Sequence, residues 1–364
     1  MDGTKPAEKL FIRAEDLTLV SAQLLEKSGL SPADAELVAR CLVEADLRGV
    51  ETHGVVRLVH YIKRIHLGLI NPVPAIRVTK VTPVAASVDG DDGFGFVVAE
   101  RAMREAIEMA SQYGVGLASV HRSSHFGMAA SYVLQAVRAG YMSLVFTNAS
   151  ASMPPWGGRD PVLGTSPFAA GAPGGKLPPF VLDMAVAVAA RGKVRLAAKR
   201  GQSVPEGWGL DKDGRATTDP QAILDGGVVL PVGGPKGSAI AMMMDIFSGV
   251  FSGSAFAGEV TNHTEEFTKP QNVGHFIMAI KPDLFLPMTE FAERMDFLTN
   301  RVKSSALADG FSEILVSGEP EARLETRRRA EGIALPKAEL DAIRIAAEGH
   351  GLPFPTLSTY AFAS

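Results

Sequence analysis

One short segment near the N-terminus combines three chemically useful side chains at regular spacing, His53, Arg57 and Tyr61. Steps of four residues place side chains on one face of an α-helix, so a helix from about residue 53 would present all three together. Imidazole can transfer a proton near neutral pH, and guanidinium can hold a carboxylate through two parallel hydrogen bonds. The segment could therefore bind a carboxylate and move a proton beside it, or it could be an ordinary polar face turned to water.

A second histidine stands where an expected strand passes into a turn. Residues 115–120 predict a strand, and the turn that follows it carries His125. Because ligands of α/β sheets gather at the carboxyl ends of strands, His125 is a candidate functional residue, with a buried structural histidine as the alternative. His121 lies four residues earlier, as in some zinc sites, but no glutamate follows it and no third ligand is near, so no metal site is predicted.

Two further polar residues are placed where chemistry is plausible. Asp183 lies in an apolar strand expected over 180–185, and an unpaired buried carboxylate there would be destabilising by several kcal/mol, so it needs partners. Those partners are either structural groups or a catalytic imidazole or cofactor. Lys236 follows a glycine-rich turn that opens an apolar helix, where free N–H groups and the amine could hold a phosphate. A plain helix start with a solvated lysine is the other interpretation.

The rest of the sequence indicates the elements that must position these residues. Expected helices cover two segments within 15–48, then about 53–68, 97–113, 129–139, 233–248 and 286–303, and a charged pair within 321–350. Expected strands lie between 76 and 88 and at 115–120, 142–148, 180–185, 276–280 and 313–316, and a surface hairpin is expected within 203–220. Ser31 before Pro32 is typical of a helix N-cap. This order predicts a mixed α/β (α+β) fold with a helical N-terminal region and C-terminal helices.

Composition excludes several classes of protein. The chain has 364 residues, 46% of them hydrophobic, which is ordinary for a globular protein. A net charge of −4 gives no electrostatic basis for binding nucleic acid or an anionic membrane. The single cysteine, Cys41, excludes an internal disulfide and any multi-cysteine metal site. Residues 1–10 contain no apolar core of a secretory signal, so a cytoplasmic location is expected.

No standard nucleotide-binding fingerprint is present. Gly93 and Gly95 lack the third glycine of a G-x-G-x-x-G motif at the required spacing, and there is no G-x-x-x-x-G-K-[ST] loop. A standard Rossmann domain is therefore not predicted.

Several motifs in order along nearly the whole chain resemble those of one family, the type 2 malate/L-lactate dehydrogenases. This family also holds ureidoglycolate and sulfolactate dehydrogenases, diketogulonate reductase and piperideine-2-carboxylate reductases. The motifs are Asp46 to Gly54 with Arg57 and Tyr61, Ser124 to Gly127, Thr147-Asn148, Leu163 to Pro167, Val181 to Ala185, Ala190 to Lys193, Pro205 to Trp208, Gly233 to Gly237 and Gly318 to Pro320.

The resemblance implies an oxidoreductase that uses NAD or NADP in a non-Rossmann cofactor domain with a mixed or antiparallel sheet. The expected reaction is hydride transfer between nicotinamide and C2 of a malate-like or lactate-like 2-hydroxy/2-oxo acid, or of a cyclic imino acid. It also implies a homodimer. Residues 76–264 are expected to form the NAD(P)-binding part, and residues 1–75 with 265–364 the helical part for substrate binding and dimerisation.

The resemblance also implies roles for individual residues. His53 or His125 would be the acid/base, with Thr52 and Asp183 orienting the imidazole or the nicotinamide. Substrate would meet Arg57, through its carboxylate, and also Tyr61 and Thr165. The cofactor contacts implied are Asn148, Ala149, Asp183, Met184, Ala185, Lys236, Gly318 and Glu319.

The sequence departs from the family pattern near these positions. Thr52 replaces a common Ser, Ser166 a common Asn, and Val186-Ala187 a common Thr-Ser pair. Pro235 replaces a common His, and Ser238 a common Tyr or Phe. These changes motivate an alternative, a cofactor-binding homologue with lost or weak turnover.

Overall fold

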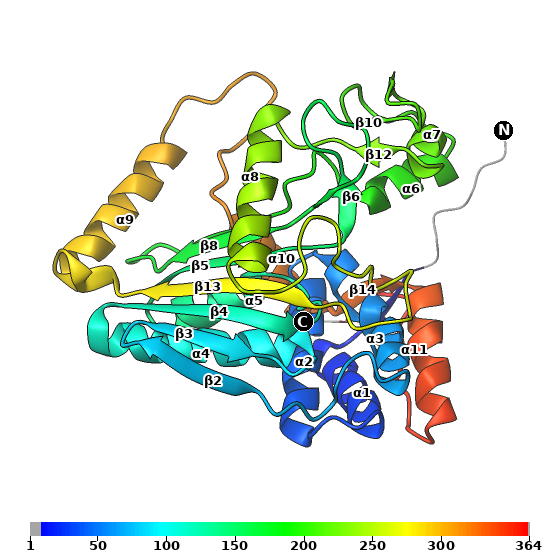
Figure 1. The fold of residues 1–364 in the computed structure, drawn as a ribbon, viewed down its shortest axis with the longest axis horizontal. Helices are drawn as coiled ribbons and strands as arrows, with labels where there is room; N and C mark the ends of the chain where they lie inside the picture. Colours follow the sequence, from blue (N-terminus) through cyan, green and yellow to red (C-terminus); the bar gives the residue numbers. More distant parts are fainter. Residues whose placement is uncertain (1–8, 363–364) are drawn as a thin grey trace.

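The computed structural model describes residues 9–362, arranged around one twisted central sheet (Figure 1). No secretory signal is expected in residues 1–10. Residues 1–8 of this segment lie outside the described residues. None of the helices between residues 9 and 362 has both the length and the apolar character needed to cross a bilayer.

The central sheet has seven strands in the order β2-β3-β4-β13-β5-β8-β9. Only β3 and β4 run parallel; the other neighbours are antiparallel, so the sheet is mixed as expected. Its strands are β2 (Arg77–Thr82), β3 (Ala85–Asp89), β4 (Val115–Ser123), β5 (Met142–Thr147), β8 (Phe168–Ala172), β9 (Phe180–Met184) and β13 (Val273–Ile280).

Two helices, α4 (Gly95–Tyr113) and α5 (Ala130–Arg138), cover one face of this sheet (Figure 1). Alternate residues of β4 are buried beneath them, among them Ala118 and Val120, as the period of a strand dictates. Gly116 allows the close approach of α4, because a Cβ there would lie 2.0 Å from the carbonyl oxygen of Ala106. The face is therefore sealed, and the chemistry must lie at the strand ends or on the opposite side.

A helical layer forms beside the sheet from both ends of the chain. The core of this layer joins residues of the first three helices to Ile333, Leu335 and Ile343 from the C-terminal region. Its elements are β1 (Lys9–Ile12), α1 (Ala14–Lys27), α2 (Pro32–Leu47), α3 (Leu58–His66), α10 (Glu319–Glu331), β14 (Ile333–Pro336) and α11 (Lys337–Gly349). The cap at Ser31 is confirmed, since its Oγ accepts the N–H of Asp34 at 3.2 Å.

The remaining elements form a small lobe and two further helices on the open face of the sheet (Figure 1). The lobe contains the expected surface hairpin, β10 with β11. These elements are β6 (Ala151–Met153), β7 (Leu163–Gly164), α6 (Arg191–Lys199), β10 (Gly209–Leu210), β11 (Ala216–Thr217), α7 (Pro220–Leu224), β12 (Val228–Val229), α8 (Pro235–Asp245) and α9 (Met288–Lys303). A π-helical turn, Ile246–Val250, continues α8.

Two expected elements differ in the structure. The helix expected from residue 53 is instead two 3₁₀ turns, Glu51–His53 and Val55–Arg57, followed by α3 from Leu58. Gly54 between them is extended, with φ −87° and ψ −155°, so the α-helical ladder cannot run through it. The strand expected at 313–316 is also wrong, because that segment carries no ladder and leads directly into α10.

The structure bears on the proposed division of the chain at residue 264. β13, which that division assigns to the helical part, lies between β4 and β5 in the middle of the sheet. If the whole sheet belongs to the cofactor-binding part, β13 must be counted with residues 76–264. With β13 added, the division into two parts remains a proposal.

Candidate active site

Three histidines from separate segments meet beside the edge of the sheet. His125 follows β4, His53 ends the first 3₁₀ turn, and His263 comes from the loop that leads into β13. The His125 ring stacks with His53 at 5.5 Å between centroids and with His263 at 4.4 Å. We call these three residues the histidine stack.

His125 is fixed through one of its two ring nitrogens. Its Nδ1 lies 2.7 Å from the Tyr61 hydroxyl and accepts the N–H of Gly127 at 3.2 Å. A backbone N–H can only donate, so Nδ1 is the acceptor and the neutral ring carries its proton on Nε2. The backbone N–H of His125 also donates to Oε1 of Gln271 at 3.0 Å, which helps to hold the residue in place. The turn therefore presents an Nε2–H group.

Tyr61 comes from α3 and is fully buried against Phe94 and Phe96. This packing fixes the Tyr61 ring. Its hydroxyl makes the polar contact with His125. Sequence analysis grouped Tyr61 with His53 and Arg57 on one helical face, and the break at Gly54 removes that face. The tertiary fold nevertheless brings Tyr61 and His53 into contact with His125, and the charge of Arg57 acts on the same ring.

Arg57 is the cation of this site. Its Nε donates to the carbonyl oxygen of Thr52 at 2.8 Å, which fixes the guanidinium and leaves the terminal nitrogens as a fork. No carboxylate among residues 9–362 forms an ion pair with it. An arginine fork without an acidic partner is suited to a carboxylate supplied by a ligand.

Burial and the Arg57 cation keep the histidines neutral. Burial lowers the pKa of His53 to about 4, and the charge of Arg57 contributes to the same shift. Burial and the neighbouring His263 lower the pKa of His125 well below its usual value, with His53 and Arg57 adding to the effect. An anion on Arg57 would oppose this charge, so ligand binding should favour a proton on the stack.

Local structure around Gly54 sets the position of His53. The buried carboxylate of Asp46 accepts the N–H of Val55 at 2.9 Å, which stabilises the start of the second 3₁₀ turn. A Cβ on Gly54 would lie 1.9 Å from Oδ1 of Asp46. Glycine is therefore required for space rather than for a left-handed backbone. Thr52 completes the turn, with its Oγ1 2.9 Å from Nδ1 of His53.

Asp183 lies near the end of β9 and faces the turn that carries His125. One carboxylate oxygen, Oδ2, accepts the N–H of Ala130 at 2.8 Å at the start of α5. The side chain is open to solvent on one side, while the protein packed on the other raises its pKa to about 6. Among the described residues, Asp183 makes no hydrogen bond to an imidazole. The expected orientation of a histidine by Asp183 is therefore not supported by a direct contact.

The residues implied as cofactor contacts frame the open face of the sheet around Asp183 and α8. Lys236 is exposed in the first turn of α8. Gly318 is left-handed at φ +90° and lies against Val181 of β9. The hydroxyl of Ser166, a buried residue near β7, has no hydrogen-bond partner among the described residues. A cation, an exposed carboxylate and an unpartnered hydroxyl fit the phosphates and hydroxyls of a dinucleotide.

Two of these positions are largely engaged within the protein. The amide of Asn148 donates to the carbonyl oxygen of Ala255 at 2.6 Å, and its Oδ1 accepts the N–H of Gly274. The carboxylate of Glu319 pairs with Lys303 at 2.6 Å and with Arg323 at 2.5 Å. These side chains support the surface, which leaves backbone groups at Ala149, Met184, Ala185 and Gly318 for a ligand.

Two of the departures from the family pattern, Val186 and Ser238, have structural explanations. Val186 is fully buried in an apolar cluster with Met153 and Val194, so a hydroxyl there would face no ligand. Ser238 is buried, and its Oγ accepts the N–H of Trp156 at 2.9 Å. The carbonyl oxygen of Thr165 accepts the N–H of Val186.

Sequence analysis missed His263. No motif surrounds it, and it stands alone in a polar loop, so only the tertiary fold reveals its place on His125. Another histidine, His275, is fully buried and structural: Thr147 and Ser123 lie 2.8 Å from its two nitrogens. Within residues 9–362, no three His, Cys, Asp or Glu side chains are placed to hold a metal ion.

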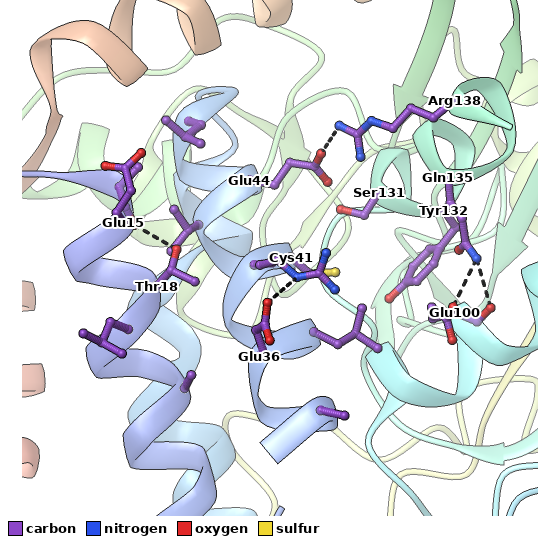
Figure 2. Close-up of a pocket in the computed structure, with 18 of the residues that line it drawn as sticks. Glu15, Thr18, Glu36, Cys41, Glu44, Glu100, Ser131, Tyr132, Gln135 and Arg138 are labelled. Carbon is purple, nitrogen blue, oxygen red and sulfur yellow. Dashed lines mark hydrogen bonds and ion pairs between the residues drawn. The ribbon is translucent and has the colours of Figure 1, made fainter. Parts of the chain in front are cut away.

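A large cavity of about 1330 Å³ lies elsewhere, between α1, α2 and α5 (Figure 2). Its polar side chains largely pair with one another, as Glu44 does with Arg138 at 2.6 Å and Gln135 with Glu100. Cys41 lines it, but burial raises the pKa of this thiol to about 12, so it is not a nucleophile. We assign the chemistry to the histidine stack instead.

Comparison with known sequences gives one family. The family described as malate/L-lactate dehydrogenase matches residues 12–344. The malate dehydrogenase of Pyrococcus abyssi is 38% identical over 340 residues, covering 91% of this chain and 92% of that protein. The NAD(+) ureidoglycolate dehydrogenase of Escherichia coli K12 is 33% identical, covering 89% and 92%. The NADP(+) (2R)-3-sulfolactate dehydrogenase of Chromohalobacter salexigens is 32% identical, covering 92% and 97%.

Comparison with solved structures gives the same fold. The sulfolactate dehydrogenase from Methanocaldococcus jannaschii superposes with a TM-score of 0.89 at 35% identity, covering 95% of this chain and 98% of that one. The Δ1-piperideine-2-carboxylate reductase from Pseudomonas syringae pvar. tomato superposes with a TM-score of 0.83 at 29% identity, covering 93% and 99%.

Proposed function

The chain belongs to the malate/L-lactate dehydrogenase family and is an NAD(P)-dependent dehydrogenase, and on that premise we propose that it reduces C2 of a 2-oxo acid or cyclic imino acid whose carboxylate binds Arg57. The observation that carries this proposal is the unpaired guanidinium fork of Arg57 beside the histidine stack. In the opposite direction the enzyme oxidises the corresponding 2-hydroxy acid.

When bound, NADH or NADPH supplies the hydride. Lys236, the Asp183 carboxylate and the backbone at Ala149, Met184, Ala185 and Gly318 would hold it, with Ser166 adjacent. The exposed carboxylate of Asp183 and the lysine at the start of α8 carry charges suited to an amide or hydroxyl and to a phosphate respectively. Neither group distinguishes NAD from NADP.

We assign the acid/base role to His125. Its Nε2–H is free to donate to the C2 oxygen while Nδ1 rests against the Tyr61 hydroxyl at 2.7 Å. A substrate carboxylate on Arg57 offsets the positive charge that opposes protonation of His125. Protonation of Nδ1 would open its bond with the Gly127 N–H, and the Tyr61 hydroxyl would turn from donor to acceptor and receive a hydrogen bond from Nδ1–H.

In reduction, His125 protonated on both ring nitrogens thus gives its Nε2 proton to the oxygen or nitrogen on C2 and is left neutral with its proton on Nδ1. In oxidation, Nε2 takes the proton back while Nδ1–H donates to Tyr61. His53 stacks on His125 and remains the second candidate for this role, since Thr52 lies 2.9 Å from its Nδ1.

Absorbance at the reduced nicotinamide band tests the proposal. Purified protein is first titrated with NADH and NADPH by fluorescence, then screened for turnover against 2-oxo acids and cyclic imines. We expect binding of at least one cofactor and turnover on at least one 2-oxo acid or cyclic imine. Cofactor binding without turnover on any of them would favour the alternative, a homologue that has lost activity.

We also propose that the enzyme is a homodimer formed through α8 and α9. α9 projects from the body in Figure 1 and contains no buried residue. It is anchored through Asp296, whose carboxylate accepts the N–H groups of Gly175, Lys176 and Leu177. Its large apolar side chains are exposed, Phe297 by 73% and Leu298 by 57%. On α8 and the turn after it, Met242, Ile246 and Phe251 are exposed as well.

A second copy of the chain is the occupant that such apolar faces fit, because a monomer gains nothing by exposing them. Light scattering after size-exclusion chromatography should give twice the chain mass of 38.5 kDa. Phe297→Glu with Leu298→Glu should give the monomer mass. A wild-type monomer at micromolar concentration would contradict the proposal.

A further inference from the structure

His263 is the member of the histidine stack that has no hydrogen-bond partner among the described residues. No hydrogen bond to either of its ring nitrogens is formed by the described residues, and its Nε2 is buried and unpaired. By contrast, His275 has both nitrogens bonded, and His53 and His125 each have Nδ1 bonded. A buried ring nitrogen without a partner is costly unless a ligand supplies one.

The loop that carries His263 is rigid. Asn262 begins a tight turn, with its side-chain oxygen accepting the N–H and the hydroxyl of Thr264 at 3.0 and 2.9 Å. Thr261 closes the base of the loop by donating to the carbonyl oxygen of Pro270, and Gln271 donates to the carbonyl oxygen of Thr261. Gln271 also binds the N–H of His125, so one side chain sets both histidines.

A buried arginine clamps the same loop onto α3. Arg64 is fully buried and donates to the carbonyl oxygens of Glu266 at 2.7 Å and Lys269 at 3.2 Å. Lys63, its neighbour, lies 3.9 Å from the centre of the Phe267 ring. Burying a whole guanidinium only to fix a loop indicates that the position of that loop matters.

We propose that His263 is a specificity-determining residue, donating an N–H to a polar group on the substrate carbon next to C2. This inference rests on the proposed function, in which Arg57 holds the C1 carboxylate and His125 the C2 oxygen. The centre of the His263 ring lies 4.4 Å from that of the His125 ring, so the two rings are immediate neighbours in the site. The substrate class is then a 2-oxo acid with a hydrogen-bond acceptor on C3, such as a carboxylate or sulfonate, rather than a simple alkyl 2-oxo acid.

Stacking alone is the competing explanation, in which His263 merely supports His125. Two substitutions separate the two roles. His263→Phe keeps a flat ring on His125 but removes the N–H, whereas His263→Gln keeps an N–H at similar reach but removes the ring. His66→Phe is the matched control, because His66 is exposed at the end of α3 away from the stack.

The experiment measures kcat/KM for oxaloacetate and pyruvate with the wild-type enzyme and all three variants. His263→Phe should lower the value for oxaloacetate by about 10–100-fold and for pyruvate by less than about threefold. His263→Gln should keep most of the preference for oxaloacetate, and His66→Phe should match the wild type.

Equal losses on both substrates with His263→Phe, or no loss on either, would overturn the inference. So would a loss on both substrates with His263→Gln that His263→Phe does not show, since that pattern belongs to stacking. A wild-type enzyme that turns over pyruvate or an imine but not oxaloacetate would also overturn it, with the proposed function intact. A wild-type enzyme without turnover on any 2-oxo acid or imine would overturn the proposed function as well.

Discussion

At the scale of single residues, the site is defined by which polar atoms lack partners within the protein. The terminal nitrogens of Arg57 have no carboxylate partner within residues 9–362, and Nε2 of His125 is left for a ligand because Nδ1 is bonded to Tyr61 and Gly127. Nδ1 and Nε2 of His275 are both bonded, so that ring is structural. The number of bonded ring nitrogens thus distinguishes a structural histidine from one that is available to a ligand. Composition and spacing could not make this distinction.

Paired substitutions decide which histidine transfers the proton. His125→Asn should lower kcat by about 10²–10⁴, because the proton donor is removed while a polar side chain remains. His53→Asn should lower it by less than about tenfold if His53 only stacks on His125. Steady-state kinetics at saturating cofactor measure both values. The reverse order, with His53→Asn the severe variant, would assign the proton transfer to His53.

Residue identities were the most predictable part of this site. His53, Arg57, Tyr61 and His125 could be selected from side-chain chemistry and motif, and the structure brings them together. His263 could not be selected, since its importance arises from a loop folding back onto α3, and nothing local in the sequence records that contact. The role assigned to each residue remains a prediction that steady-state kinetics of the variants can test.

At the scale of elements, the break at Gly54 positions the first half of the site. A continuous helix would have put His53 one turn behind Arg57, whereas two 3₁₀ turns place His53 beside His125. The periodicity that predicted a helix from residue 53 was correct for α3, where Leu58 and Ile62 are buried. It failed before Leu58 because Asp46, nine residues away from Val55, caps the second turn.

Substitution of Gly54 should test this arrangement. Gly54→Ala would press a methyl group against the Asp46 carboxylate, 1.9 Å away, and so displace the turn that carries His53. We expect a loss of about 1–3 kcal/mol in the free energy of unfolding, together with a lower kcat/KM. Urea denaturation and steady-state kinetics measure the two effects. Gly68→Ala is the control in open space, although its left-handed φ of +69° will itself cause some strain.

Helix α10 supports the same turn from the far end of the chain. Arg328 pairs with Glu51 at 2.5 Å, and Arg48 pairs with Glu325 at 2.9 Å. Such pairs between residues more than 270 positions apart cannot be read from sequence spacing. The charged character of α10 was predicted, but its partners were not.

At the scale of the whole molecule, one late strand joins the two halves of the fold. β13 completes the sheet between β4 and β5, and the loop before it delivers His263 to the site. The class of fold was predictable from alternating strands and helices. The strand order was not, because insertion of β13 depends on a pairing across about 130 residues with β5.

Buried neutral histidines make the whole molecule sensitive to acid. Burial lowers the pKa of His275 and His263 to about 3 and of His53 to about 4, and that of His125 well below 6.5. Below pH 6.5 the unfolded chain therefore binds protons that the folded chain does not, so the free energy of unfolding should fall as pH drops from about 6.5 toward 4. Asp46 and Asp183, whose pKa values burial raises to about 8 and about 6, oppose this trend, but they are two groups against four histidines.

Urea unfolding at several pH values between 7.5 and 4.5 measures this effect. The midpoint should decline as pH falls below about 6.5, where the histidines of the unfolded chain take up protons. His275→Gln should make the decline shallower, because one buried neutral imidazole is removed. A midpoint that stays constant to pH 4.5 would mean that the four histidines are protonated in the folded protein.

The binding of the substrate carboxylate by Arg57 underlies the proposed reaction, and kcat/KM for a 2-oxo acid measures it. Arg57→Ala should lower kcat/KM by at least about a hundredfold, since two hydrogen bonds to a charged group are lost. Arg57→Lys should chiefly raise KM, because a point charge replaces a fork. Wild-type enzyme should also discriminate against the uncharged amide of the same substrate by a similar factor. Equal turnover of acid and amide, with kcat/KM unchanged in Arg57→Ala, would contradict the account.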